Sequence, residues 1–174
     1  MNHNNTTHVR ENEIVITRIF DAPLELVFDV TKEEHLSKWW GPNGFTSTFQ
    51  TFDMKPGGTW KFIMHSPNGV DFPNTNVIIE VVQLEKIVFK HDVFPHFLAT
   101  AIFEELNRKA KLTYSSFFEE DATVFEKVKT YAVPGAEQTG TSWGTSGKYV
   151  IMLSVNEKYY YSVPKQSMKR KVDE

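Results

Sequence analysis

The chain contains no cysteine, which excludes a disulfide framework, a thiolate metal site and a cysteine nucleophile. It also lacks a long apolar run, because no stretch approaches the ~20 residues that a membrane-spanning helix needs. The opening sequence, MNHNNTTHVRENE, lacks the apolar core of a signal peptide. A net charge of only −3 gives no electrostatic reason to expect nucleic acid or an anionic membrane surface as a partner. We therefore expect a cytoplasmic protein that binds neither nucleic acid nor membrane.

Aromatic and other apolar residues, in contrast, are abundant. The 174 residues are 40% hydrophobic and include 14 Phe, 6 Tyr and 4 Trp. A chain of this length fits one domain, which hides roughly 70% of the surface of its unfolded chain. We expect a flexible segment at 1–12, the folded domain at 13–155 and an atypical extension at 156–174.

The chain begins with the pattern of a strand followed by short helices. Residues 13–20 alternate and are rich in β-branched side chains, which is typical of a strand. Pro23 suits the first turn of a helix, and apolar residues recur at helical spacing over 23–40 with a break near Thr31. The Gly-Pro-Asn-Gly turn at 41–44 ends this region.

From Phe45 the apolar residues repeat with a period of two. Alternation and turn signals predict six strands, at about 45–53, 58–66, 74–83, 86–93, 98–106 and 109–119. Strands at such short spacing form an antiparallel meander. From Ala122 the helical spacing of apolar residues returns.

This order of elements predicts the fold class. A sheet of about seven strands cannot bury a face against two short helices alone, so a long C-terminal helix must cross it. A twisted sheet that curls around a helix leaves a cavity unless large side chains fill it. We therefore expect an α+β protein in which a curved antiparallel sheet wraps around a long C-terminal helix.

Several turns and junctions also resemble those of a known superfamily. They are RIFDAP at 18–23, KWWGP at 38–42, KPGGTW at 55–60, SPNG at 66–69, EVV at 80–82 and KIVF at 86–89. In this order they resemble the START/Bet v I-like superfamily (SRPBCC), and within it the AHSA-type domains, homologues of the activator of a heat-shock-chaperone ATPase. The resemblance extends over roughly residues 13–140.

The resemblance implies a helix-grip fold with a pocket between the sheet and the last helix. It implies neither an enzyme nor a cofactor, because the superfamily includes carriers, cyclases and co-chaperone domains. We expect the protein to bind a small apolar or amphipathic molecule in an internal hydrophobic cavity. One alternative is a chaperone-accessory domain with a filled core, which would contact a chaperone through an exposed apolar patch. Another is a cyclase- or hydrolase-like enzyme, whose cavity would hold at least two converging titratable groups.

The polar residues form no recognisable catalytic or metal-binding motif. His91 and His96 flank a Phe-Pro turn. Asp92 directly follows His91, so the side chains of His91 and Asp92 point to opposite faces of a strand. No cluster of His, Asp and Glu has the spacing of a metal site. We expect no catalytic residue, no metal and no cofactor, and we expect His35 and His65 to be solvated.

The alternating aromatic side chains are the main candidates for lining a pocket, with simple core packing as the alternative for any one of them. The predicted pocket residues are Trp40, Trp60, Phe62, Phe89, His91, Phe103, Tyr114 and Trp143. We expect the mouth near Trp40 and the turn at 94–97. His91, Tyr114 and Thr100 are the polar residues that could orient a ligand.

Glu80 interrupts the apolar run at 77–82. Alternation places it on the same face as Ile78 and Val82. We favour a solvated carboxylate on the convex face of the sheet. The alternative is a polar anchor inside the cavity.

The segment at 139–147 departs from the resembling family, whose closing helix is rich in leucine. Its three glycines each cost ~1 kcal/mol in a helix relative to alanine. Their spacing, at Gly140, Gly144 and Gly147, still places them on one helix face. Either the segment is not helical, or a helix over about 134–153 turns its glycines toward the sheet and leaves room for a ligand.

Overall fold

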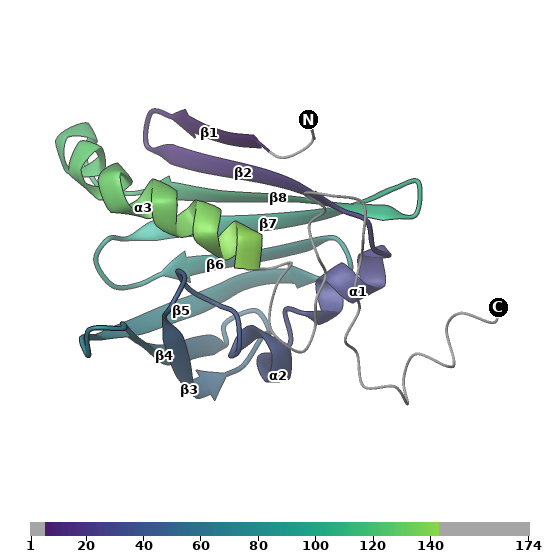
Figure 1. The fold of residues 1–174 in the computed structure, drawn as a ribbon, viewed down its shortest axis with the longest axis horizontal. Helices are drawn as coiled ribbons and strands as arrows, with labels where there is room; N and C mark the ends of the chain where they lie inside the picture. Colours follow the sequence, from purple (N-terminus) through teal and green to yellow (C-terminus); the bar gives the residue numbers. More distant parts are fainter. Residues whose placement is uncertain (1–5, 143–174) are drawn as a thin grey trace.

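The described residues form one curved antiparallel sheet of eight strands (Figure 1). The computed structural model describes residues 6–142, with side chains described for residues 6–135. Across the sheet the strands lie in the order β1-β2-β8-β7-β6-β5-β4-β3. Their bounds are β1 Thr6–Arg10, β2 Glu13–Phe20, β3 Thr46–Phe52, β4 Thr59–His65, β5 Asp71–Val82, β6 Lys86–His91, β7 Phe97–Leu106 and β8 Lys109–Phe118. The strands from β3 to β8 follow one another as a meander, and β2 joins the sheet beside β8.

The helices of the described residues lie on one side of this sheet (Figure 1). They are α1 (Leu24–Asp29), α2 (Glu33–Leu36) and α3 (Ala122–Ser142). The α1 helix contacts β7 and β8, whereas α3 contacts β2. The start of α3 is fixed by Asp121, whose Oδ1 accepts hydrogen bonds from the backbone N–H groups of Thr123 at 2.8 Å and Val124 at 3.0 Å.

The predicted α+β helix-grip architecture is confirmed, with one strand more than expected. The additional strand, β1, lies in the segment for which we expected flexibility. Its sequence, TTHVR, has little apolar character, so its strand conformation depends on backbone pairing with β2. A side-chain bond strengthens this edge, because the Arg18 guanidinium donates to the carbonyl oxygen of Thr6 at 3.0 Å.

The C-terminal helix begins twelve positions before the range 134–153 that the glycine spacing suggested, at Ala122. It continues past Pro134 as far as Ser142, so the described part of the 139–147 segment, residues 139–142, is helical. Trp143, the later glycines and the expected extension at 156–174 lie outside the described residues.

Two clusters of buried side chains fill the space between the sheet and the helices. The larger cluster lies around α1 and α2 and includes Phe20, Val27, Trp39 and Phe103. The smaller one lies beneath α3 and consists of Ile14, Ile16, Phe118, Phe125 and Val128. Because each helix region buries its own cluster, the face of the sheet is covered at two separate places.

A β-bulge in β5 changes the faces that simple alternation assigned. The pairing with β6 shifts between Ile78 and Glu80, so that Ile79 is exposed and Val81 packs against the larger cluster. Glu80 forms an ion pair with Lys86, at 2.9 Å, and its side chain is 43% exposed. Glu80 is therefore a solvated carboxylate, as favoured from the sequence, but it does not share a face with Ile78.

Candidate ligand pocket

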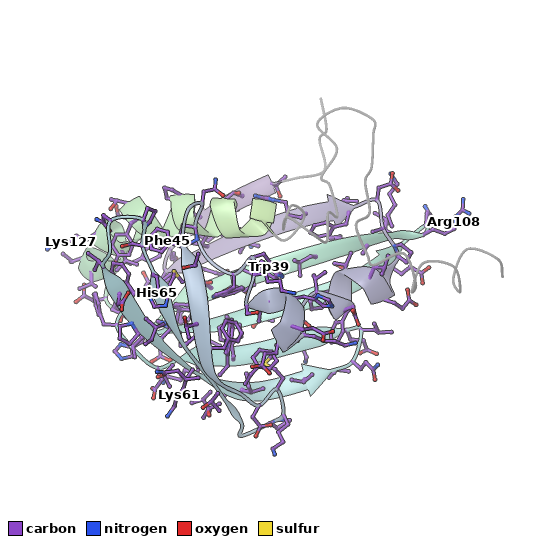
Figure 2. All side chains as sticks on the ribbon, turned by 60° about the horizontal axis from the view of Figure 1, so that its bottom comes forward. Trp39, Phe45, Lys61, His65, Arg108 and Lys127 are labelled. Carbon is purple, nitrogen blue, oxygen red and sulfur yellow. The ribbon has the colours of Figure 1, made fainter. Side chains whose placement is uncertain are left out.

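A pocket of about 760 Å³ lies between the curved sheet and α3. The sheet bends strongly enough for β3 and β4 to rise toward the side that carries the helices (Figure 2). The walls are mainly aromatic and aliphatic, with Trp40, Phe45, Phe62, Phe72, Phe89, Phe94, Phe97, Tyr114 and Phe118 as the aromatic side chains contributed by the loops and strands. On the helix side the wall consists of Tyr131, Ala132 and Gly135 of α3.

Trp40 is the central side chain of one wall. Its ring lies edge-on to those of Trp60, Phe89 and Tyr114, with centroids at 4.9, 6.4 and 6.4 Å. Edge-to-face pairs at such distances stabilise an aromatic cluster beyond the burial of its surface. Trp40 is only half-buried. Its position therefore lets the ring support the core on one side and contact a pocket ligand on the other.

Five of the eight predicted pocket residues line this pocket. They are Trp40, Phe62, Phe89, His91 and Tyr114. Val93, Phe94 and Pro95, at the turn where we expected the mouth of the pocket, also belong to the lining.

Two of the predicted residues lie elsewhere in the core, and a third is outside the described residues. Trp60 is 1% exposed and is covered by Trp40, so it supports the pocket wall without forming it. Phe103 lies under α1, where its ring meets that of Phe28 at 5.0 Å. Trp143 is the one outside the described residues. Thr100 is also not part of the lining, since its neighbours Ala99 and Ala101 face inward and Thr100 faces outward.

Sequence reasoning missed the pocket residues contributed by β2 and by the cross-strand neighbours of His91. Ile14, Ile16 and Phe118 line the wall beneath α3. Phe97 pairs with His91 across β6 and β7, and their rings stack with centroids 4.5 Å apart. The alternation of each strand contained this signal, but the register between strands was needed to combine it.

A polar row interrupts the apolar wall on β5 and β6. Asn76 pairs with His91 in the register of these strands. The His91 ring contacts the Pro95 carbonyl oxygen through Nδ1, at 2.9 Å, and Asn74 Oδ1 through Nε2, at 3.0 Å. Burial lowers the pKa of His91, although the hydrogen bond to Pro95 acts in the opposite direction. The imidazole is therefore held by the protein as part of the wall, and it also ties down the rim at Pro95.

Tyr114 supplies a hydroxyl group at the centre of the sheet. Burial raises the pKa of Tyr114 to about 12, while a hydrogen bond with Ser116 acts in the opposite direction. The phenol therefore stays neutral at physiological pH. Arg18 adds a positive charge to the lining and donates to the carbonyl oxygens of Thr6 and Thr17, at 3.0 and 2.9 Å.

The sequence pattern of one protein family matches most of this chain. The family is described as "Activator of Hsp90 ATPase homolog 1-like protein", and the match extends over residues 21–162. The chain belongs to this family. No curated protein matches the chain.

Solved structures share the fold of this AHSA1-like chain. Protein NE0264 from Nitrosomonas europaea superimposes with a TM-score of 0.69 at 20% identity, covering 78% of this chain and 94% of that one. A protein from Arthrobacter aurescens gives a TM-score of 0.69 at 19% identity, with 89% and 98% covered. The AHSA1 protein from Silicibacter pomeroyi gives 0.61 at 16% identity, with 75% and 93% covered. Likeness at these identities shows a common helix-grip fold.

A hydroxyl, an imidazole and a carboxylate also align at the exposed sheet edge of this AHSA1-like domain. Thr48 Oγ1 lies 2.8 Å from His65 Nε2, and His65 Nδ1 lies 2.7 Å from Asp71 Oδ1. The side chains of His65 and Asp71 are 34% and 59% exposed, so water competes for each bond. The row has the residue types of a catalytic triad, but a triad also needs hydrogen-bond donors for a developing oxyanion in a site that excludes water. We therefore interpret it as a structural link across β3, β4 and β5.

The expectation that His35 is solvated was wrong. His35 is buried, not solvated, and its Nε2 lies 3.3 Å from both Asp29 and Glu34.

Among residues 6–142, no group of three or more His, Cys, Asp or Glu side chains is arranged to hold a metal ion. None of the helices that the structure describes is long and apolar enough to cross a membrane.

Proposed function

We propose that this AHSA1-like protein binds a small apolar or amphipathic molecule in the pocket between the sheet and α3. The observation that carries the proposal is a pocket of about 760 Å³ with mainly aromatic and aliphatic walls. Small-molecule sites typically enclose ~300–1,000 Å³ and combine apolar walls with a few polar groups. Filling this space would remove apolar surface from water, which is the main favourable contribution to such binding.

The wall chemistry suits a flat or flexible apolar body with few polar groups. Trp40, Phe62, Phe89 and Phe97 contribute aromatic rings to the pocket wall. Both ring nitrogens of His91 are engaged with protein groups. The Tyr114 phenol stays neutral, because burial raises its pKa to about 12. This arrangement favours binding over catalysis, because a general acid or base needs a free polar atom within reach of its substrate.

The test uses N-phenyl-1-naphthylamine, a fluorophore whose emission rises in apolar surroundings. We expect saturable binding to the full chain. The variant Ala132→Phe places a ring in the pocket and should weaken binding at least tenfold. Ala122→Phe is the matched control, since Ala122 lies on the same helix but is exposed outside the lining. The proposal fails if the wild type shows no saturable binding, or if both variants bind equally well.

A second candidate function is a chaperone-accessory role, and an exposed apolar patch favours it. Leu98, Ile102 and Phe117 lie on the face of the sheet opposite the helices and are 38%, 40% and 51% exposed. Leu98 and Phe117 are direct cross-strand neighbours, so they form one surface. The test is the ATPase rate of an Hsp90-type chaperone. The double variant Leu98→Ser with Phe117→Ser should abolish stimulation, whereas Ala132→Phe should preserve it.

A further inference from the structure

The pocket wall contains a buried amide whose oxygen has no partner. Asn76 on β5 is 1% exposed and belongs to the lining. Among the described residues, its Oδ1 has no hydrogen-bond partner. An acceptor left unpaired in the protein interior costs free energy, and most buried acceptors are paired. Asn76 therefore requires an explanation that core packing alone does not give.

The surroundings of Asn76 determine which end of the amide is available. Its Nδ2 lies 3.5 Å from the carbonyl oxygen of Trp60, which can only accept. The nitrogen therefore faces Trp60, and the oxygen faces away from it. A contact of 3.5 Å is long for a hydrogen bond, and the terminal torsion of asparagine is soft. The amide can thus turn slightly toward a molecule in the pocket at little cost.

The polar side chains next to Asn76 in the pocket wall, Asn74 and His91, are already engaged with protein groups. Asn74 shares a hydrogen bond with His91 and donates to the carbonyl oxygen of Phe72 at 2.7 Å. Among the described side chains that line the pocket, the buried polar atom without a partner is Asn76 Oδ1, so it is the group that a ligand there would satisfy.

We propose that the ligand carries a hydrogen-bond donor, a hydroxyl or N–H group, which binds Asn76 Oδ1 while its apolar body fills the aromatic pocket. This inference rests on the proposed ligand-binding function and narrows it to donor-bearing amphipathic molecules such as phenols. A ligand that offered only an acceptor would leave the Asn76 oxygen unpaired. A ligand donor satisfies that oxygen and leaves the contact between Nδ2 and Trp60 in place.

The test compares two probes with the same propylphenyl skeleton, one with a hydroxyl donor and one without. Titration calorimetry measures 4-propylphenol against 4-propylanisole, in which a methyl group replaces the phenolic hydrogen. We expect wild-type protein to bind the phenol about tenfold more tightly, the effect of one net hydrogen bond to a buried group. In Asn76→Leu the preference should vanish or reverse, because the phenolic O–H is then buried without a partner. The same variant should melt at or above the wild-type temperature, since it removes an unpaired polar group.

The matched control is Thr75→Val, one residue away on β5 and outside the pocket lining, which should keep the wild-type preference. Wild-type protein that binds the anisole as tightly as the phenol overturns the inference and leaves the proposed function intact. Protein that binds neither probe overturns both. A preference abolished by Ser116→Ala but kept by Asn76→Leu also overturns the inference, by moving the acceptor to Ser116. If Asn76→Leu does not fold, Asn76→Ala serves in its place, with the same expected loss of the preference for the phenol.

Discussion

Trp39 and Trp40 are neighbours in the chain with different surroundings. Trp39 is 6% exposed, and its Nε1 donates to the carbonyl oxygen of Val30 at 3.1 Å. This bond fixes the connection between α1 and α2 from within the core. Trp40 is half-buried and lines the pocket. One side chain therefore serves mainly stability, and the other serves both stability and the shape of the pocket.

Alanine substitutions should separate these two roles. Trp39→Ala removes a fully packed ring and should lower the free energy of unfolding by about 3–5 kcal/mol. Trp40→Ala should cost less, about 2–3 kcal/mol, because part of its ring already faces the pocket. Urea unfolding measures both values. Trp40→Ala should also change the affinity for N-phenyl-1-naphthylamine more strongly than Trp39→Ala does. An equal loss of affinity in both variants would contradict the assignment of Trp40 to the pocket wall.

His91 makes the stability of the folded protein depend on pH in the acidic range. Both ring nitrogens face acceptors, and a neutral imidazole can donate to only one of them. Burial nevertheless holds the pKa of His91 below its usual value of about 6.5. The unfolded chain therefore binds this proton more readily than the folded protein does. The stabilising contribution is complete above about pH 6.5 and is lost as the pH falls toward the lowered pKa.

Replacing His91 with glutamine should reduce this loss. We expect the free energy of unfolding of His91→Gln to fall less steeply than that of wild type between about pH 7 and pH 5. Nearby Asp92 and His96 remain in place in both proteins. His8→Gln, on the exposed strand β1, is the comparison for losing a histidine as such. Parallel pH profiles for wild type and His91→Gln would show that His91 is not a source of the acid sensitivity.

At this scale the sequence predicted which side chains face inward but not which part of the inner face they occupy. Alternation correctly turned Phe62, Phe89 and Phe103 away from solvent. It could not show that α1 covers Phe103 while Phe89 stays beside the open space. The distinction depends on where the helices cross the sheet, which is a property of tertiary packing. Asn76 was missed for a related reason, because an unpaired oxygen is visible only when its neighbours are placed.

Among the elements, the tight connection between β3 and β4 depends on its glycines. Gly57 has a φ of +80°, and its N–H donates to the carbonyl oxygen of Ile78 at 2.8 Å. A Cβ on Gly58 would lie 2.2 Å from the backbone oxygen of Asp53. The turn therefore brings two backbones closer than any other residue type allows. The hydrogen bond between Gly57 and Ile78 links the β3–β4 connection to β5, which carries Asn76.

Alanine should consequently be far more harmful at Gly58 than at Gly69. Gly58→Ala forces the turn apart and should cost about 3 kcal/mol or more. Gly69 has a φ of +82° and open space where a Cβ would lie, so Gly69→Ala should cost only the backbone strain, roughly 1–2 kcal/mol. Thermal and urea unfolding of the two variants measure the difference. Similar losses would show that the close approach at Gly58 is relieved by movement of the turn.

Element positions were predictable where periodicity was strong. The six meander strands lie within about three residues of their expected bounds, because alternating apolar residues and glycine turns define them locally. β1 escaped prediction because its side chains are polar and its stability comes from pairing with β2. The bulge at Ile78–Glu80 escaped as well, since an inserted residue leaves no distinct pattern in a continuous apolar run.

For the whole molecule, the positions of the buried side chains on α3 determine which part of this helix covers the core. Phe125 and Val128, both 1% exposed, belong to the first two turns of the helix. They complete the cluster formed by Ile14, Ile16 and Phe118 on the sheet. Later in the helix, Ala132 and Gly135 border the pocket. The first half of α3 therefore covers the core, while the part that follows shapes the site.

Two truncated chains should behave differently for this reason. A chain that ends after Glu120 lacks α3 and exposes the apolar cluster beneath it, so we expect aggregation or a state without cooperative unfolding. A chain that ends after Pro134 keeps Phe125 and Val128 and should unfold cooperatively, although at a lower urea concentration than the full chain. It should also bind N-phenyl-1-naphthylamine more weakly, because it lacks Gly135, which borders the pocket. Circular dichroism during urea unfolding and the fluorophore titration measure these outcomes. Cooperative folding of the chain that ends after Glu120 would show that the sheet closes without its helix, and the helix-grip account of the stability would then be wrong.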